Sequence, residues 1–268
     1  MRRRSKIAST AAAIGFLVLG FVVRPFVESV SKRVGENIGD RIVAPKDRAS
    51  ANLTPSLTQA AAYKVAVINR TNLPNEVIQH VVKVLATQVS RDLAPVWGVD
   101  AQLRFVKNGE APAPDEWWLE ILGTSDIGDA IAYHEMTPEG LPRAKIFTET
   151  AKQGKASWTA AASHELISML VNPRTNLTVI GDPQTSGKAY ALEIPDPCQA
   201  DTYKIDGVEV SDFVFPAWFD PTRSPNSTQF DFLRLIDRPL TLRPGGYVIT
   251  IGPNLKQDWQ TIYAKSGA

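Results

Sequence analysis

The chain has 268 residues, of which 44% are hydrophobic and 21% charged, enough to bury a full core in one or two domains. Lys and Arg together number 29 and Asp and Glu 28, so the net charge gives no reason to expect nucleic acid as a partner. The single cysteine, Cys198, excludes an internal disulfide and a four-cysteine zinc site, so any metal must be held by His, Asp and Glu.

Residues 1–29 are predicted to form a membrane anchor. A basic cluster within residues 2–6 precedes residues 7–23, which carry no charge and are followed by Arg24. About seventeen residues at about 1.5 Å each give a helix of about 25 Å, slightly shorter than a hydrocarbon core of about 30 Å. The basic cluster indicates a single-pass protein with a cytoplasmic N-terminus and an extracytoplasmic globular part. The alternative is a secreted protein whose signal peptide is cleaved, although no small-x-small cleavage site follows.

Residues 30–61 are polar and contain Pro45 and Pro55, which is typical of a juxtamembrane linker. The folded part is therefore expected over residues 62–268, with a β-rich C-terminal subdomain from about residue 185. The overall prediction is an α+β fold, with a mixed twisted sheet and two main helices.

The folded part is expected to begin with a buried strand over Tyr63 to Asn69. A helix follows, with Pro74 in its first turn and apolar residues at helical spacing until Pro95. Four further strands are predicted, starting at Ala101, Glu116, Asp129 and Arg143. A second helix then runs from an N-cap at Ser157 to Asn172 and Pro173.

The C-terminal part is expected to be mainly β. Asp206-Gly207 lies between alternating arms and predicts a hairpin. Further strands are predicted within residues 188–194 and from Tyr247, and Trp218 and Phe219 are expected to pack under the cleft.

The second helix carries His164 and Glu165, which form half of an H-E-x-x-H metallohydrolase motif. Ser168 stands where the second histidine would be. Helical spacing places Ala161, His164 and Ser168 on a cleft-facing side and Leu166, Ile167 and Leu170 against the sheet. The alternative is a hydrogen-bonded core histidine beside a solvent-facing Glu165.

The order of strands before this helix resembles that of zincin metallopeptidases, and of their metzincin branch in particular. The resemblance implies an antiparallel edge strand that binds peptide, either Ala130 to Met136 or the strand after it. It also implies a zinc ion, with Glu165 taking a proton from the zinc-bound water. An oxyanion would be stabilised by Tyr133, Tyr190 or Tyr203, among which the sequence does not choose.

The segment "SHELISMLVNP" also resembles a Ser-His-Glu-Leu-x-Glu-Met-Leu-x-Asp-Pro pattern found in a group of bacterial and phage proteins. In those proteins the pattern is followed by an acidic segment and a Pro-Ala-Trp-Phe stretch, and both have counterparts in this chain. Here Ser168 and Asn172 replace two acids of that pattern. If those acids are metal ligands in the relatives, zinc affinity falls unless other residues compensate. The predicted metal ligands are His164, Glu193 and Asp196, although the two acids are also consistent with a turn. His134 could reach the same cleft.

Two functions remain open. The first is a membrane-anchored, zinc-dependent peptide hydrolase with a degenerate motif. The second is a noncatalytic pseudo-peptidase, on a bacterial surface or virion, that holds a peptide or protein along the edge strand.

Overall fold

The computed structural model describes residues 62–181, 187–252 and 259–265. The predicted membrane span (residues 7–23) and linker (residues 30–61) lie outside these ranges. Within them, no helix combines the length and apolar character needed to cross a membrane.

The N-terminal half confirms the predicted order of strands and helices and adds a short helix, α5. Its elements are β1 (Tyr63–Asn69), α3 (Asn75–Thr87), η1 (Gln88–Leu93), α4 (Ala94–Trp97), β2 (Ala101–Val106), β3 (Trp117–Leu122), β4 (Ala132–Met136), β5 (Pro142–Phe147), α5 (Thr148–Gln153) and α6 (Trp158–Val171).

Five of these strands form one mixed sheet in the order β2-β1-β3-β5-β4. The first four of these strands run parallel to one another, whereas β4 is antiparallel to β5 and lies at the edge. Parallel strands are normally covered on both faces, which explains why the last five residues of β1 are all buried. Of the two candidates for an antiparallel edge, the structure selects the segment ending at Met136.

The first long helix continues past Pro95, where the sequence predicted its end. The chain passes from α3 through the π-helical turn η1 into α4 and stops only at Gly98, which has a φ of 68°. Proline inside a helix lacks an N–H group and clashes with the carbonyl four residues earlier. A π turn changes that local bonding pattern and so accommodates Pro95.

The C-terminal half consists of short strands and 3-10 turns. Its elements are β6 (Thr178–Ile180), β7 (Ala189–Ala191), η2 (Asp196–Cys198), β8 (Thr202–Ile205), β9 (Val208–Ser211), η3 (Pro216–Phe219), β10 (Tyr247–Ile251) and β11 (Gln260–Tyr263). Asp206 and Gly207 form the predicted hairpin turn, with φ values of 47° and 82°.

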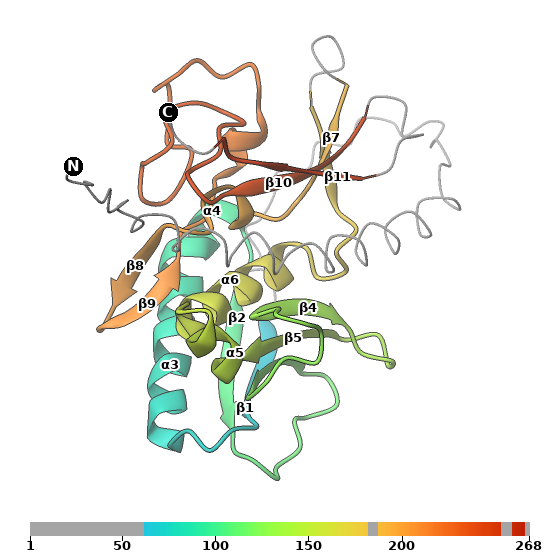
Figure 1. Cartoon of the computed structure of the whole chain (residues 1–268), viewed down its shortest axis with the longest axis vertical. Helices are drawn as coiled ribbons and strands as arrows, with labels where there is room; N and C mark the ends of the chain where they lie inside the picture. Colours follow the sequence, from blue (N-terminus) through green and yellow to red (C-terminus); the bar gives the residue numbers. More distant parts are fainter. Residues whose placement is uncertain (1–61, 182–186, 253–258, 266–268) are drawn as a thin grey trace, which may run out of the picture.

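Four C-terminal strands form a second sheet in the order β11-β10-β7-β6. Figure 1 shows α6 between this sheet and β4 and β5 of the first. One core cluster contains residues of both halves, including the fully buried Trp218 and the nearly buried Phe219. The fold class is therefore α+β, as predicted, and α6 lies where the two halves meet.

Candidate functional site

The α6 helix begins and ends at the residues its sequence predicts. The Ser157 side chain accepts a hydrogen bond from the backbone N–H of Ala160, which caps the first turn. At the other end, the backbone N–H of Asn172 donates to the Ser168 carbonyl. With both ends fixed, the side chains between them have defined directions.

Two sides of α6 have different surroundings. One packs into the main core and comprises Leu166, Ile167 and Leu170. The other lines a cleft and includes Ala161, His164, Glu165 and Ser168. The predicted division of the helix into a core side and a cleft side is confirmed.

Ser163, the first residue of the Ser-His-Glu sequence, points away from the cleft and fixes the back of α6. Its hydroxyl donates to Gln88 Oε1 at 2.7 Å and accepts from the backbone N–H of Ser211 at 2.9 Å. Gln88 belongs to the π turn and also donates to the Ser211 carbonyl at 2.9 Å. These buried bonds join α6, η1 and β9, so they set the position of the neighbouring His164.

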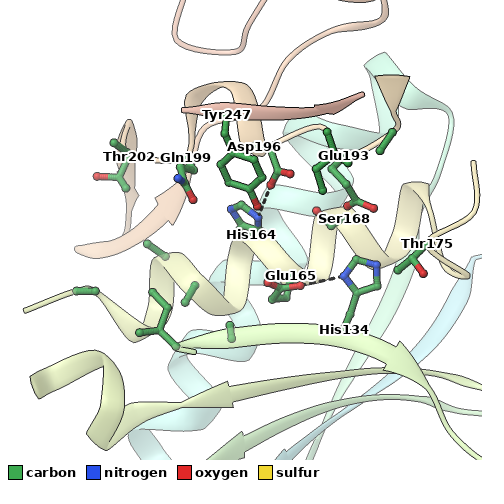
Figure 2. A pocket seen from close by; sticks show the side chains of 18 of the residues that line it. His134, His164, Glu165, Ser168, Thr175, Glu193, Asp196, Gln199, Thr202 and Tyr247 are labelled. Atoms are coloured by element: carbon green, nitrogen blue, oxygen red, sulfur yellow. Dashed lines mark hydrogen bonds and ion pairs between the residues drawn. The ribbon is translucent and has the colours of Figure 1, made fainter. Parts of the chain in front are cut away.

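Glu165 is bound to a histidine of the edge strand. His134 Nδ1 lies 2.9 Å from Glu165 Oε2, and both residues are buried (Figure 2). Burial alone would lower the pKa of His134, but the hydrogen bond to Glu165 and the charges of Glu193 and Glu165 raise it to about 9. The raised pKa favours the charged form of His134 beside Glu165. Because Glu165 is buried, the alternative of a solvent-facing Glu165 is wrong.

His164 is bound to Asp196 on the opposite side of the cleft. Its Nε2 lies 3.1 Å from Asp196 Oδ1, and the Tyr247 side chain also hydrogen bonds to Asp196 (Figure 2). Burial opposes a charge on His164, but Asp196 and the other carboxyl groups of the cleft raise its pKa. Burial and those same carboxyl groups raise the pKa of Tyr247, which keeps the phenol protonated as a donor.

Glu193 lies farther along the cleft and is bound to the residue that ends α6. Asn172 Nδ2 donates to Glu193 Oε1 at 2.8 Å, while Asn172 Oδ1 accepts from the backbone N–H groups of Asn176 and Leu177. Burial raises the pKa of Glu193 to about 7, against the opposing charge of His134. An aspartate at position 172 would set two carboxyl groups side by side, so the amide suits this arrangement.

Residues from both halves of the molecule enclose a cavity of about 280 Å³. Its charged or titratable lining residues are His134, His164, Glu165, Glu193, Asp196, Glu209 and Tyr247. Much of the remaining lining is small or apolar, contributed by alanines, Leu177, Ile249 and Trp259. The cleft is thus an apolar hollow whose polar groups gather around α6.

The three expected zinc ligands all line this cleft. His164 Nε2 and Asp196 Oδ1 are 3.1 Å apart, close to the spacing of about 3.3 Å between two ligands on a tetrahedral zinc. Glu193 is turned to Asn172, and Ser168 occupies the place of a second motif histidine. In the part of the chain that the structure describes, no three His, Cys, Asp or Glu side chains are grouped as metal ligands.

The tyrosine in the cleft is not one of those that the sequence suggested. The Tyr133 hydroxyl bonds Asp126, the Tyr203 hydroxyl bonds Asp92, and Tyr190 is not among the cleft-lining residues. Tyr247 was missed because it lies far from the motif in the sequence and begins a strand. The one sequence feature that pointed to this region was the Gly245-Gly246 pair just before Tyr247. In the structure this turn packs against Pro197, and a Cβ on Gly246 would lie only 2.1 Å from the Pro197 carbonyl oxygen.

Searches of protein-family models, curated proteins and solved structures found no match to this chain.

Proposed function

We propose that the protein binds an extended peptide segment along β4, in the cleft between β4 and α6, without cleaving it. The observation that carries this proposal is the position of β4. It has a strand neighbour, β5, on one side only, and its residues Ala132 and His134 line the cleft. A strand edge of this kind can add a peptide through main-chain hydrogen bonds.

The state of Glu165 favours binding over hydrolysis. A general base must accept a proton from water, but this carboxylate is already in a buried pair with His134. Ser168 is also not set up as a nucleophile paired with His164, because its Oγ has no hydrogen bond to that histidine. The zincin-like architecture that we propose for this chain would then serve as a scaffold for recognition.

Hydrogen exchange tests this function. Reduced, carboxymethylated lactalbumin, an unfolded protein, serves as the source of extended peptide. We expect it to slow amide exchange in residues 132–136 of the full chain and to leave β11, another edge strand, unchanged. Protection confined to β11, or none in β4, would contradict the proposal.

Zinc-dependent peptide hydrolysis is a second candidate, and one observation favours it. His164 of α6 and Glu193 and Asp196 of the segment after β7 line the same cleft as Glu165. Hydrolysis would require Glu193 to leave Asn172 and Glu165 to leave His134. The test is metal analysis of the full chain and of His164→Ala, with cleavage of the same lactalbumin by wild type and Glu165→Gln. Stoichiometric zinc lost in His164→Ala, together with cleavage lost in Glu165→Gln, would establish the hydrolase.

We further propose that residues 7–23 hold the cleft on the extracytoplasmic side of a membrane. The basic cluster before that segment supports this topology. Protease added outside intact cells that express the chain should reach the domain, and protection from protease until the cells are lysed would argue against it.

A further inference from the structure

The carboxyl groups that line the cleft outnumber its histidines. His134 is paired with Glu165, and His164 with Asp196. Glu193 has a neutral partner, the Asn172 amide. Among the described residues that line the cleft, none is a lysine or an arginine. Glu193 therefore has no cationic partner among these lining residues, and a carboxylate partly removed from water is stabilised by one.

A buried hydroxyl beside Glu193, that of Ser168, also makes no hydrogen bond of normal geometry. Ser168 is 1% exposed, and its Oγ slightly favours the charged form of Glu193. Figure 2 shows Ser168 and Glu193 close together in the cleft. Because a buried polar atom without a partner is unfavourable, a ligand that donates hydrogen bonds would be favoured at this place.

The rest of the cavity suits a narrow apolar group. Six alanines line it, namely Ala132, Ala156, Ala160, Ala161, Ala191 and Ala200. Their side chains are small, and the cavity that they help to line has a volume of about 280 Å³. An alkyl chain would displace water from this apolar surface, which is favourable.

We propose that the cleft binds a primary ammonium group on an apolar stem, with the ammonium donating to Glu193 and to Ser168 Oγ. This inference rests on the proposed function, because a peptide offers such a group at its N-terminus or on a lysine side chain. An ammonium suits the site better than a guanidinium does. The planar guanidinium binds a carboxylate best through both oxygens, and one oxygen of Glu193 already accepts from Asn172.

Calorimetric titration of the full chain with three alanine-rich hexapeptides tests the proposal. One peptide has a free N-terminus, one is N-acetylated, and one is N-acetylated with a single central lysine; all have amidated C-termini. We expect the acetylated, lysine-free peptide to bind about tenfold or more weakly than at least one of the others, the loss typical of a charge-assisted hydrogen bond. The tighter of the two amines identifies the source of the ammonium. Equal binding of all three, or of none, would overturn the proposal.

Variants locate the ammonium. Glu193→Gln keeps the shape and removes the charge, so we expect it to weaken the preferred amine by about tenfold or more and the acetylated peptide little. Glu149→Gln, an exposed residue of α5, is the matched control and should leave both affinities unchanged. If Glu193→Gln binds the amine as tightly as wild type does, the assignment of Glu193 is wrong.

Two further measurements separate the failure of this inference from that of the proposed function. Equal binding of all peptides, with β4 protected from exchange, would keep peptide binding and reject the ammonium site. Binding of n-butylammonium that is lost in Glu193→Gln, without β4 protection by lactalbumin, would keep the ammonium site and reject peptide binding. All these titrations contain a chelator, which removes metal ions. If the amine binds only when zinc replaces the chelator, the proposal is overturned.

Discussion

Two groups of buried carboxyl side chains in this protein have different surroundings. In the cleft, Glu165 and Asp196 each pair directly with a histidine from another element, and both pairs line an open cavity. In the C-terminal core, Asp212 and Asp231 are both fully buried and accept hydrogen bonds mainly from backbone N–H groups nearby. The first group is arranged where a ligand can enter, whereas the second holds together loops of the C-terminal half. Burial of an acid alone therefore does not mark a binding site; the open cavity beside it does.

The largest effect is expected when a change of pH ionises Asp212, which lies beside Asp231 in the C-terminal core. Burial, and then the neighbouring Asp231, raise the pKa of Asp212 from 3.8 to about 8. Because the folded protein holds this proton more tightly than the unfolded chain does, protonation of Asp212 stabilises the fold. This contribution is complete below about pH 4 and is lost as the pH rises to about 8. Each pH unit in that window removes up to about 1.4 kcal/mol. Asp212→Asn mimics the protonated acid, so denaturant unfolding should show it equal to wild type near pH 4 and more stable at pH 8. Parallel pH profiles would show that Asp212 is ionised in the fold.

The next effect concerns the turn that places Tyr247. Gly246→Ala would bring a Cβ against the Pro197 carbonyl, and we expect a loss of about 3 kcal/mol in the free energy of unfolding. Gly123→Ala is the control, because its Cβ would meet nothing within 4 Å and its φ is not positive. Equal stability of the two variants would show that the turn does not need this close approach.

A smaller effect is expected behind the cleft. Ser163→Ala leaves the buried N–H of Ser211 without its acceptor, which should cost about 2 kcal/mol of stability. It should also weaken peptide binding, because α6 loses its bond to Gln88. Ser90→Ala removes an exposed hydroxyl from the same π turn and serves as the control. If peptide affinity is unchanged in Ser163→Ala, the hydrogen bonds of Ser163 are not needed for peptide binding.

The smallest effect is expected at the third histidine. His80 is exposed and its Nε2 lies 3.1 Å from the Asp206 carbonyl oxygen, outside the cleft. His80→Ala should therefore change stability by about 0.5 kcal/mol or less and leave peptide affinity unchanged. A clear loss of peptide binding in a calorimetric titration would mean that the cleft is not the only recognition surface.

The sequence predicted the first half of the fold well, because its signals are local. The apolar run Tyr63–Asn69 and the capping residue Ser157 each determine structure within a few residues. The end of the first helix was predicted wrongly, because a tertiary contact decides it. Gln88 in the π turn bonds Ser163 and Ser211, which are distant in sequence.

The candidate site was predicted in part. Glu165, His164, Glu193 and Asp196 do line one cleft, since helical spacing and the acidic segment both point there. The pairing of Glu165 with His134 depends on the strand register between β4 and β5, which no local pattern reveals. The role of Asn172 likewise became visible only with Glu193 beside it.

The π turn sets the rotational phase of the first helix. Successive residues of an α-helix are turned by about 100°, so removal of the turn's extra residue would rotate everything after it by about that angle relative to α3. Trp97 would then point away from Val214, whose carbonyl its indole N–H now reaches at 3.0 Å. One residue of chain length in η1 thus keeps the start of the helix aligned with the first sheet and its end aligned with the C-terminal half.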